Sequence, residues 1–235
     1  MKKLWILMIG LWCLSSANAQ EKEAPATSFA LSVTHDQAFG FYPGFFGSIR
    51  LKENLSLTAY GLLWTSPVLG NPDTGSDLWL ETGVGLAFQR KNWTINPSLA
   101  LMSGKFLSGA ETGRIADGIA PSLYTLYVGE RFEFEGLGIY YKSVATGPRA
   151  NTDYWLAWAF PGVLVHPNIS VGAHYEQYFL TRVSDGDPDI LYHWLGAYLK
   201  FYFGDYSLRL SAGKNFDPLF FGDQFYKVNF FIPLP

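Results

Sequence analysis

Residues Leu78 to Gln89, with the sequence LWLETGVGLAFQ, give the clearest indication of the fold class of this chain. Starting at Leu78, every second residue is apolar or threonine: Leu, Leu, Thr, Val, Leu and Phe. The residues between them, from Trp79 onward, are mostly small or polar: Trp, Glu, Gly, Gly, Ala and Gln. Because successive side chains of a β-strand point to opposite faces, this alternation predicts a strand with one apolar face and one small or polar face.

The same two-residue alternation recurs along the chain, at residues 55–63, 93–101, 170–176 and 194–201. No long stretch has the 3.6-residue apolar repeat of an amphipathic helix. A strand that faces lipid on one side and a polar lumen on the other has this pattern. The sequence therefore predicts an all-β protein, a single antiparallel transmembrane β-barrel.

We place twelve strands, near residues 27–35, 44–51, 55–65, 78–89, 92–102, 118–129, 131–142, 153–165, 169–182, 191–203, 206–213 and 224–233. Short connections, at 52–54, 90–91, 130, 166–168 and 204–205, alternate with long ones, at 36–43, 66–77, 103–117, 143–152, 183–190 and 214–223. Outer-membrane barrels combine short periplasmic turns with long external loops in this way. An even number of strands also puts both ends of the barrel domain on the periplasmic side.

Two features leave ten strands as an alternative. Pro97, Pro121 and Pro161 fall inside predicted strands, where a proline removes a hydrogen-bond donor from the ladder. Between residues 131 and 142 the apolar phase changes around Gly136 and Gly138. A glycine often marks such a change, and we therefore expect a β-bulge at this point.

The composition supports a membrane location. Aromatic residues make up 17% of the chain and charged residues only 16%, whereas a soluble domain usually carries roughly 25% charged residues. After residue 20 there is no apolar run long enough to span a bilayer as a helix. In lipid, the remaining way to pair every backbone group is a closed barrel.

The first 19 residues are predicted to be a secretory signal peptide, and residues 20–235 the barrel domain. Lys2 and Lys3 supply the positive start, an apolar run follows, and Ala17 and Ala19 are the small residues that a signal peptidase requires. An N-terminal membrane anchor is the alternative. Acylation at Cys13 is excluded because Trp12 stands where a small residue is needed.

Cleavage after Ala19 would remove the only cysteine together with Lys2 and Lys3. Of 17 basic residues 15 would remain, against 20 acidic ones, a net charge of −5. A mildly acidic chain without a basic cluster is a poor nucleic-acid binder. No disulfide framework is available either.

Many aromatic residues lie close to the ends of the predicted strands, where an amphipathic ring would meet lipid headgroups. We expect them to form the aromatic belts of a membrane barrel, with the core of a soluble β-sandwich as the alternative. They are Trp64, Trp79, Trp93, Tyr140, Tyr141, Tyr154, Trp155, Tyr192, Trp194, Tyr202, Phe203, Tyr206 and Tyr226.

Nine charged or titratable residues fall on the phase predicted to face the lumen. Side chains of both signs could line a wet pore, or they could pair across the lumen and close it. Both interpretations stay open at this point. The candidate lumen-lining residues are Arg50, Glu81, Glu133, Glu135, His174, Glu176, Lys200, Arg209 and Lys227.

His174 and Glu176 share a strand face with Ser170, which raises the question of a hydrolase. Nucleophilic catalysis requires the serine within hydrogen-bond reach of the histidine. Four residues along a strand amount to roughly 13 Å, which is too far. We therefore expect a lumen pair between His174 and Glu176, no catalytic residue and no enzyme.

A metal or cofactor is not expected. Asp185, Asp187 and Asp189 space three carboxylates by two residues, but the glycine and distal glutamate of an EF-hand loop are missing. A solvated acidic loop is the preferred interpretation. The sequence also contains no phosphate-binding loop, zinc pattern or dinucleotide fingerprint.

As a whole, the pattern resembles the small outer-membrane channel proteins of about twelve strands, such as the nucleoside-channel and oligosaccharide-channel families. This resemblance rests on the strand and loop pattern of the entire mature chain. It implies a location in the outer membrane of a Gram-negative cell and a narrow passive channel for small hydrophilic solutes. The partners it implies are outer-membrane lipid, the outer-membrane assembly machinery during biogenesis and a small solute.

Three alternatives remain at this stage. The first is a non-conducting barrel with a structural or adhesive role. The second is a membrane-embedded lipid-modifying hydrolase, and the third is a soluble exported β-sandwich.

Overall fold

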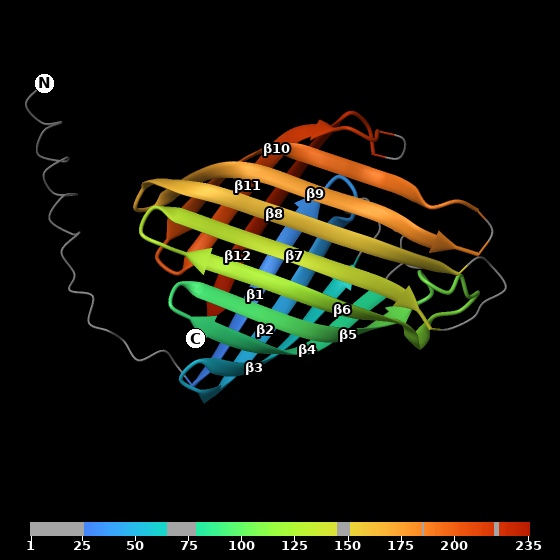
Figure 1. Cartoon of the computed structure of the whole chain (residues 1–235), viewed down its shortest axis with the longest axis horizontal. Coiled ribbons are helices and arrows are strands. Elements are labelled where there is room, and N and C mark those ends of the chain that lie inside the picture. Colours follow the sequence, from blue (N-terminus) through green and yellow to red (C-terminus); the bar gives the residue numbers. More distant parts are fainter. Residues whose placement is uncertain (1–25, 65–78, 145–150, 185, 219–220) are drawn as a thin grey trace, which may run out of the picture.

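The computed structural model describes residues 26–64, 79–144, 151–184, 186–218 and 221–235, and these form one antiparallel β-barrel (Figure 1). The predicted signal peptide, the loop 66–77 and Asp185 lie outside the described residues. The strands are β1 (Thr27–Asp36), β2 (Gly40–Lys52), β3 (Leu55–Trp64), β4 (Trp79–Arg90), β5 (Trp93–Gly104), β6 (Arg114–Val128), β7 (Phe132–Ser143), β8 (Thr152–His166), β9 (Ile169–Val183), β10 (Asp189–Phe203), β11 (Tyr206–Asn215) and β12 (Gln224–Leu234).

Each strand pairs with its neighbours in the sequence, and β1 pairs with β12 to close the barrel. The closing pair runs from Phe29 opposite Leu234 to Asp36 opposite Lys227. The prediction of twelve strands is confirmed and the ten-strand alternative is excluded, because Pro97, Pro121 and Pro161 lie inside continuous strands.

The pairing of Phe29 with Leu234 places both ends of the described chain at one end of the barrel, called here the turn end. Connections of two or three residues join the strands there, at 53–54, 91–92, 129–131, 167–168 and 204–205. The opposite end, called the loop end, carries longer connections such as residues 105–113. The predicted asymmetry between turns and loops is therefore present.

The connection between β1 and β2 corrects one prediction. We expected a long loop over residues 36–43, but the two strands are joined by residues 37–39 alone. The reason is local: Asp36 accepts hydrogen bonds from the backbone N–H groups of Ala38 and Phe39, at 3.0 and 2.7 Å. A carboxylate that bonds the backbone two and three residues further on stabilises a tight turn.

The β-bulge expected near Gly136 and Gly138 is also wrong. The register of β7 against β8 is continuous from Phe132 opposite Val163 to Tyr141 opposite Tyr154. In the sequence, the apolar residues of β7 change from one phase to the other because its inward-facing residues become apolar towards the loop end. Both glycines lie on the outward phase of β7, and the ring of Trp155 occupies the space that a side chain at Gly138 would need.

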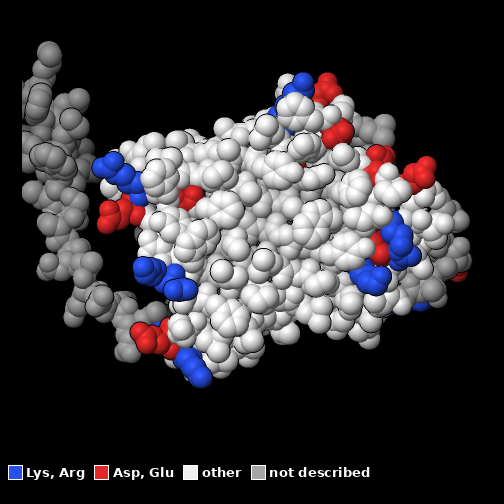
Figure 2. Space-filling view, in the orientation of Figure 1, with Lys and Arg blue, Asp and Glu red and all other residues white. Residues whose placement is uncertain are grey.

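The outer face of the barrel is an apolar band. Val84, Leu99 and Leu210, near the middle of their strands, are exposed by 61%, 53% and 40%. Figure 2 shows that the charged side chains on the visible face gather towards the two ends and leave an uncharged band between them. Such a band is what a barrel presents to the acyl chains of a bilayer. No helix among the described residues has the length and apolarity to cross a membrane.

Candidate functional site

The lumen of the barrel is the candidate site, and its two halves differ in character. Towards the turn end, β3 to β6 line it with small polar side chains. Thr58 Oγ1 lies 3.1 Å from Asn96 Oδ1, and the hydroxyls of Ser98 and Ser122 are 2.6 Å apart. All four residues are half-buried and retain some contact with solvent. This half of the lumen is therefore a polar vestibule.

Ion pairs cross the vestibule between non-adjacent strands. Arg209 on β11 donates a hydrogen bond of 2.6 Å to Glu135 on β7, and the Lys200 ammonium on β10 lies 3.8 Å from Glu133 on β7. Glu133 also accepts hydrogen bonds from two tyrosine hydroxyls of β10, Tyr198 at 2.7 Å and Tyr202. Because β7 is four strands from β11 and three from β10, these contacts reach across the interior and not along its wall.

A second charged group lies nearer the loop end. The Lys227 ammonium on β12 lies 2.7 Å from Glu176 on β9 and 3.3 Å from Asp36 on β1. His174 shares a hydrogen bond of 3.2 Å with Glu176. Lys227 thus links two carboxylates that are each at most 1% exposed, as a buried charge requires.

Glu81, on β4, is a further buried acid and has three neutral donors. Tyr60 donates to it at 2.8 Å, Trp64 at 3.0 Å and Tyr141 at 3.1 Å. Tyr60 reaches Glu81 because Gly83 lies beneath its ring, where any larger residue would collide with that ring. The hydrogen bond from Tyr141 links β7 to β4, three strands away in the barrel.

Eight aromatic rings form a collar around the inner wall at the level of these acids. Consecutive ring centroids in the collar are 4.1–6.3 Å apart, which is the usual range for interacting aromatic pairs. Lys227 closes the circle, since its ammonium lies 5.9 Å from the ring centroids of both end members. In order, the collar consists of Tyr42, Trp64, Trp79, Phe106, Tyr154, Tyr178, Tyr192 and Trp194.

Phe39 lies at the centre of the collar. Its ring contacts Trp64 on β3 at a centroid distance of 4.9 Å and Tyr178 on β9 at 5.4 Å. These two strands are six apart in a ring of twelve, so Phe39 touches opposite walls. It belongs to the turn between β1 and β2 and not to the wall. This turn therefore contributes a plug to the lumen.

The connection between β5 and β6 contributes to the same closure. Phe106 stacks on Trp79 at 4.3 Å, and Leu107 is fully buried. Asp117 holds this segment by accepting hydrogen bonds from the backbone N–H groups of Leu107 and Ser108, at 2.6 and 3.2 Å. Asp117 thus stabilises the connection between β5 and β6, as Asp36 stabilises the turn between β1 and β2.

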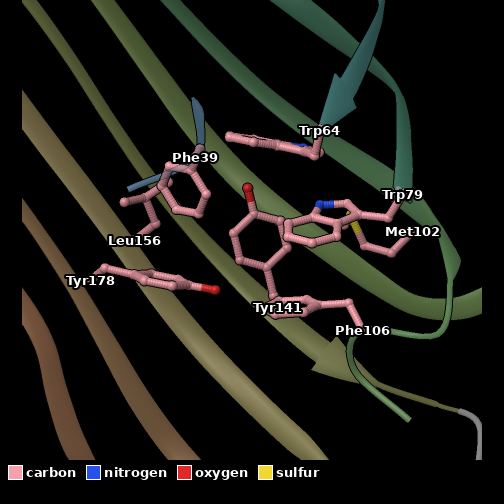
Figure 3. A pocket seen from close by; sticks show the side chains of 8 residues that line it. All are labelled: Phe39, Trp64, Trp79, Met102, Phe106, Tyr141, Leu156 and Tyr178. Carbon is pink, nitrogen blue, oxygen red and sulfur yellow. The ribbon is translucent and has the colours of Figure 1, made fainter. Parts of the chain in front are cut away.

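Little space remains in the collar with Phe39 in place. The cavity in Figure 3 has a volume of about 10 Å³ and is lined by Phe39, Met102, Leu156 and five other residues. A cavity of that size holds about one water molecule. Among the described residues, the ring of Phe39 therefore obstructs the lumen at the level of the collar.

All nine sequence-predicted lumen residues lie on the inward phase of their strands, and their role in conduction stays a prediction. Eight of them take part in the ion pairs and hydrogen bonds described above. The ninth, Arg50, lies near the turn end of β2 and is half-buried. Ser170 shares a hydrogen-bond distance of 3.3 Å with the Tyr198 hydroxyl, while His174 is paired with Glu176 as expected.

The predicted aromatic belt is correct only in part. Trp93, Trp155, Phe203, Tyr206 and Tyr226 are exposed on the outer face. Seven of the rings assigned to the belt instead point inward and are buried or half-buried: Trp64, Trp79, Tyr141, Tyr154, Tyr192, Trp194 and Tyr202. The signal was present in the sequence, since Trp79 shares its phase with Glu81 and Gly83.

A family model described as "Family of unknown function (DUF6733)" matches residues 1–234. The chain belongs to this family. No curated protein sequence matches the chain.

Three solved structures are similar to this barrel. The first is the COG4313 outer membrane channel from Pseudomonas putida F1, with a TM-score of 0.53 and 13% identity over 94% of this chain and 100% of that one. The second is the KdgM porin, with a TM-score of 0.51 and 12% identity over 88% and 99% of the two chains. The third is the NanC porin, at 0.53 and 8% over 88% and 100%. The expected resemblance to small outer-membrane barrels is therefore confirmed at the level of the fold.

Proposed function

We propose that this protein is an outer-membrane channel that passes small solutes by diffusion through a narrow lumen. The proposal rests on one observation, which is that the residues that obstruct the lumen come from connections and not from the barrel wall. Phe39, which fills the centre of the collar, and Phe106, a member of the collar, both belong to connections between strands, while the vestibule wall formed by β3 to β6 is small and polar. A connection can move while the hydrogen-bonded barrel stays intact, because local opening costs less than global unfolding.

The proposed location follows from the apolar outer band and from the channels and porins that share the fold. Outer-membrane lipid is then the partner of the band, and the outer-membrane assembly machinery a partner during biogenesis. Export would use residues 1–19 as the signal peptide, cleaved near Ala19. The expected mature N-terminus is Gln20, which sequencing of the membrane-inserted protein would test.

A catalytic function receives less support from the geometry. His174 is bonded to Glu176 and Ser170 to Tyr198, so each side chain is engaged with a partner other than the one that nucleophilic catalysis requires. We therefore assign His174 and Ser170 to the packing of the lumen, and the proposed function is transport without chemistry.

Planar-bilayer recording of the purified, refolded full-length protein tests the proposal. Folding is established beforehand by heat-modifiable mobility and by circular dichroism. We expect discrete conductance steps that small hydrophilic solutes from a panel block to different degrees. A correctly folded protein that stays electrically silent would overturn the proposal and favour a structural or adhesive barrel.

A further inference from the structure

We propose that the aromatic collar is a binding site for solutes that carry an aromatic ring, and that Phe39 occupies this site when no solute is present. This inference rests on the proposed function and names the class of solute for it. It makes Phe39 a built-in competitor of the solute, because both would use the same place at the centre of the collar.

The contacts of Phe39 define what the centre of the collar accepts. Its ring meets those of Trp64, Tyr178 and Tyr192 at interplanar angles of 61°, 66° and 73°. Such edge-to-face arrangements are favourable for aromatic rings because the positive ring edge meets a negative ring face. A flat aromatic ring that replaced Phe39 would find the same partners.

The polar groups of the collar favour an aromatic solute over a sugar. Tyr42, Trp64 and Tyr192 already donate hydrogen bonds to the carboxylates of Asp36, Glu81 and Glu176. A hexose would need partners for about five hydroxyl groups, and burying a hydroxyl without a partner is costly. An aromatic ring has no such requirement.

The collar can still bond one or two polar substituents. In Figure 3 the Tyr178 hydroxyl points towards the middle of the lining residues. The solute class is therefore an aromatic ring with few polar groups, such as a hydroxyl or a hydroxymethyl group.

Exchange of Phe39 for a solute does not require the barrel to open. The side chain of Phe39 is held by packing against aromatic and aliphatic side chains, while its backbone N–H is held by Asp36. A solute ring would restore the ring contacts that Phe39 loses on leaving. The equilibrium between the two occupants then depends on the solute concentration.

Equilibrium binding to the full-length protein in detergent micelles tests this inference. Benzyl alcohol serves as the aromatic probe and glucose as the hydroxyl-rich probe, with titration into empty micelles subtracted. Phe39→Ala removes the competitor. Phe45→Ala, which removes a ring from the lipid-facing side of β2 where Phe45 is 48% exposed, is the matched control.

We expect saturable binding of benzyl alcohol to the wild type and no binding of glucose. Phe39→Ala should bind benzyl alcohol at least about tenfold more tightly, because the competent state becomes fully populated, and Phe45→Ala should match the wild type. If Phe39→Ala does not fold, Phe39→Leu should show a smaller gain. Equal affinity of wild type and the folded Phe39 variant, equal binding of glucose, or no saturable binding to the wild type would overturn the inference.

Bilayer recordings of the same preparations separate this inference from the proposed function. Proteins that conduct ions but do not bind as expected would support the proposed channel and contradict the aromatic site. Proteins that bind as expected but never conduct would contradict the proposed channel and support the aromatic site.

Discussion

The Asp36 carboxylate accepts a hydrogen bond of 2.7 Å from the backbone N–H of Phe39, and this contact couples the wall of the barrel to the plug in its lumen. Asp36 is the last residue of β1 and is itself held by the Lys227 ammonium at 3.3 Å. The position of Phe39 therefore depends on a charged network that runs from β1 through β12 to Glu176 on β9.

Replacement of Asp36 by alanine should release the plug. The variant loses two hydrogen bonds to the turn, at Ala38 and Phe39, and hydrogen bonds to a charged group are worth about 1.5–3 kcal/mol each. A loss of that size raises the open fraction at least about tenfold. Single-channel open probability measures it. Glu53→Ala, in an exposed turn at the opposite end, is the control, and an open probability equal to that of the control would contradict this role of Asp36.

Replacement of Lys227 by methionine should destabilise the barrel. The change leaves the carboxylates of Asp36 and Glu176 buried without their shared cation, and breaking a buried ion pair costs about 3–5 kcal/mol. Urea unfolding of the protein in lipid vesicles measures the free energy of unfolding. Lys52→Met, at an exposed strand end, should change it little. A variant of Lys227 as stable as that control would show that the network adds no stability.

Removal of the Glu135 charge should change the ion selectivity of the vestibule. In Glu135→Gln, Arg209 keeps its positive charge but loses the carboxylate that lies 2.6 Å away. The lumen becomes more positive, so the reversal potential in a salt gradient should shift towards anion selectivity. Asp205→Asn, in a turn at the same end, controls for surface charge. The absence of a shift beyond that control would reject Glu135 as a pore-lining residue.

A positive charge in the middle of the outer band should impair assembly in the membrane. Val84 is 61% exposed on β4, and an arginine on the lipid face near the midplane costs about 2–4 kcal/mol. Val84→Arg should therefore lower the free energy of unfolding in lipid vesicles by that amount and reduce the yield of heat-modifiable protein. Val84→Leu keeps the surface apolar and should behave as the wild type. Equal stability of the two variants would mean that this face does not meet acyl chains.

The strands could be predicted from the sequence because the side-chain period of a strand is strict. Alternation in the segment that begins at Leu78 placed β4 within one residue at each end, and all twelve strands were located in the same way. The predictions were wrong where the residues on one face of a strand change from polar to apolar along its length. On β7 the inner face passes from Glu133 and Glu135 to Ile139 and Tyr141, which mimics a register change in the sequence although the backbone is regular.

The closure of the lumen was less accessible to sequence reasoning. Strand phase alone assigns Trp79 and Trp194 to the inside, but proximity to the strand ends suggested lipid contact for both. Phe39 lies in a turn, where no periodicity applies, and its position depends on contacts with β3, β9 and β10. An aspartate such as Asp36 can stabilise a tight turn by bonding the backbone that follows it, but this tendency does not place the ring of Phe39.

If Phe39 closes a conducting lumen, its removal should change the single-channel conductance, which is compared between Phe39→Ala, the wild type and Phe45→Ala. All three proteins are refolded and recorded in the same bilayer and salt. We expect Phe39→Ala to open more often or to a larger conductance, while Phe45→Ala stays at the wild-type level. Identical recordings from the folded Phe39→Ala and wild-type proteins would contradict this role of Phe39.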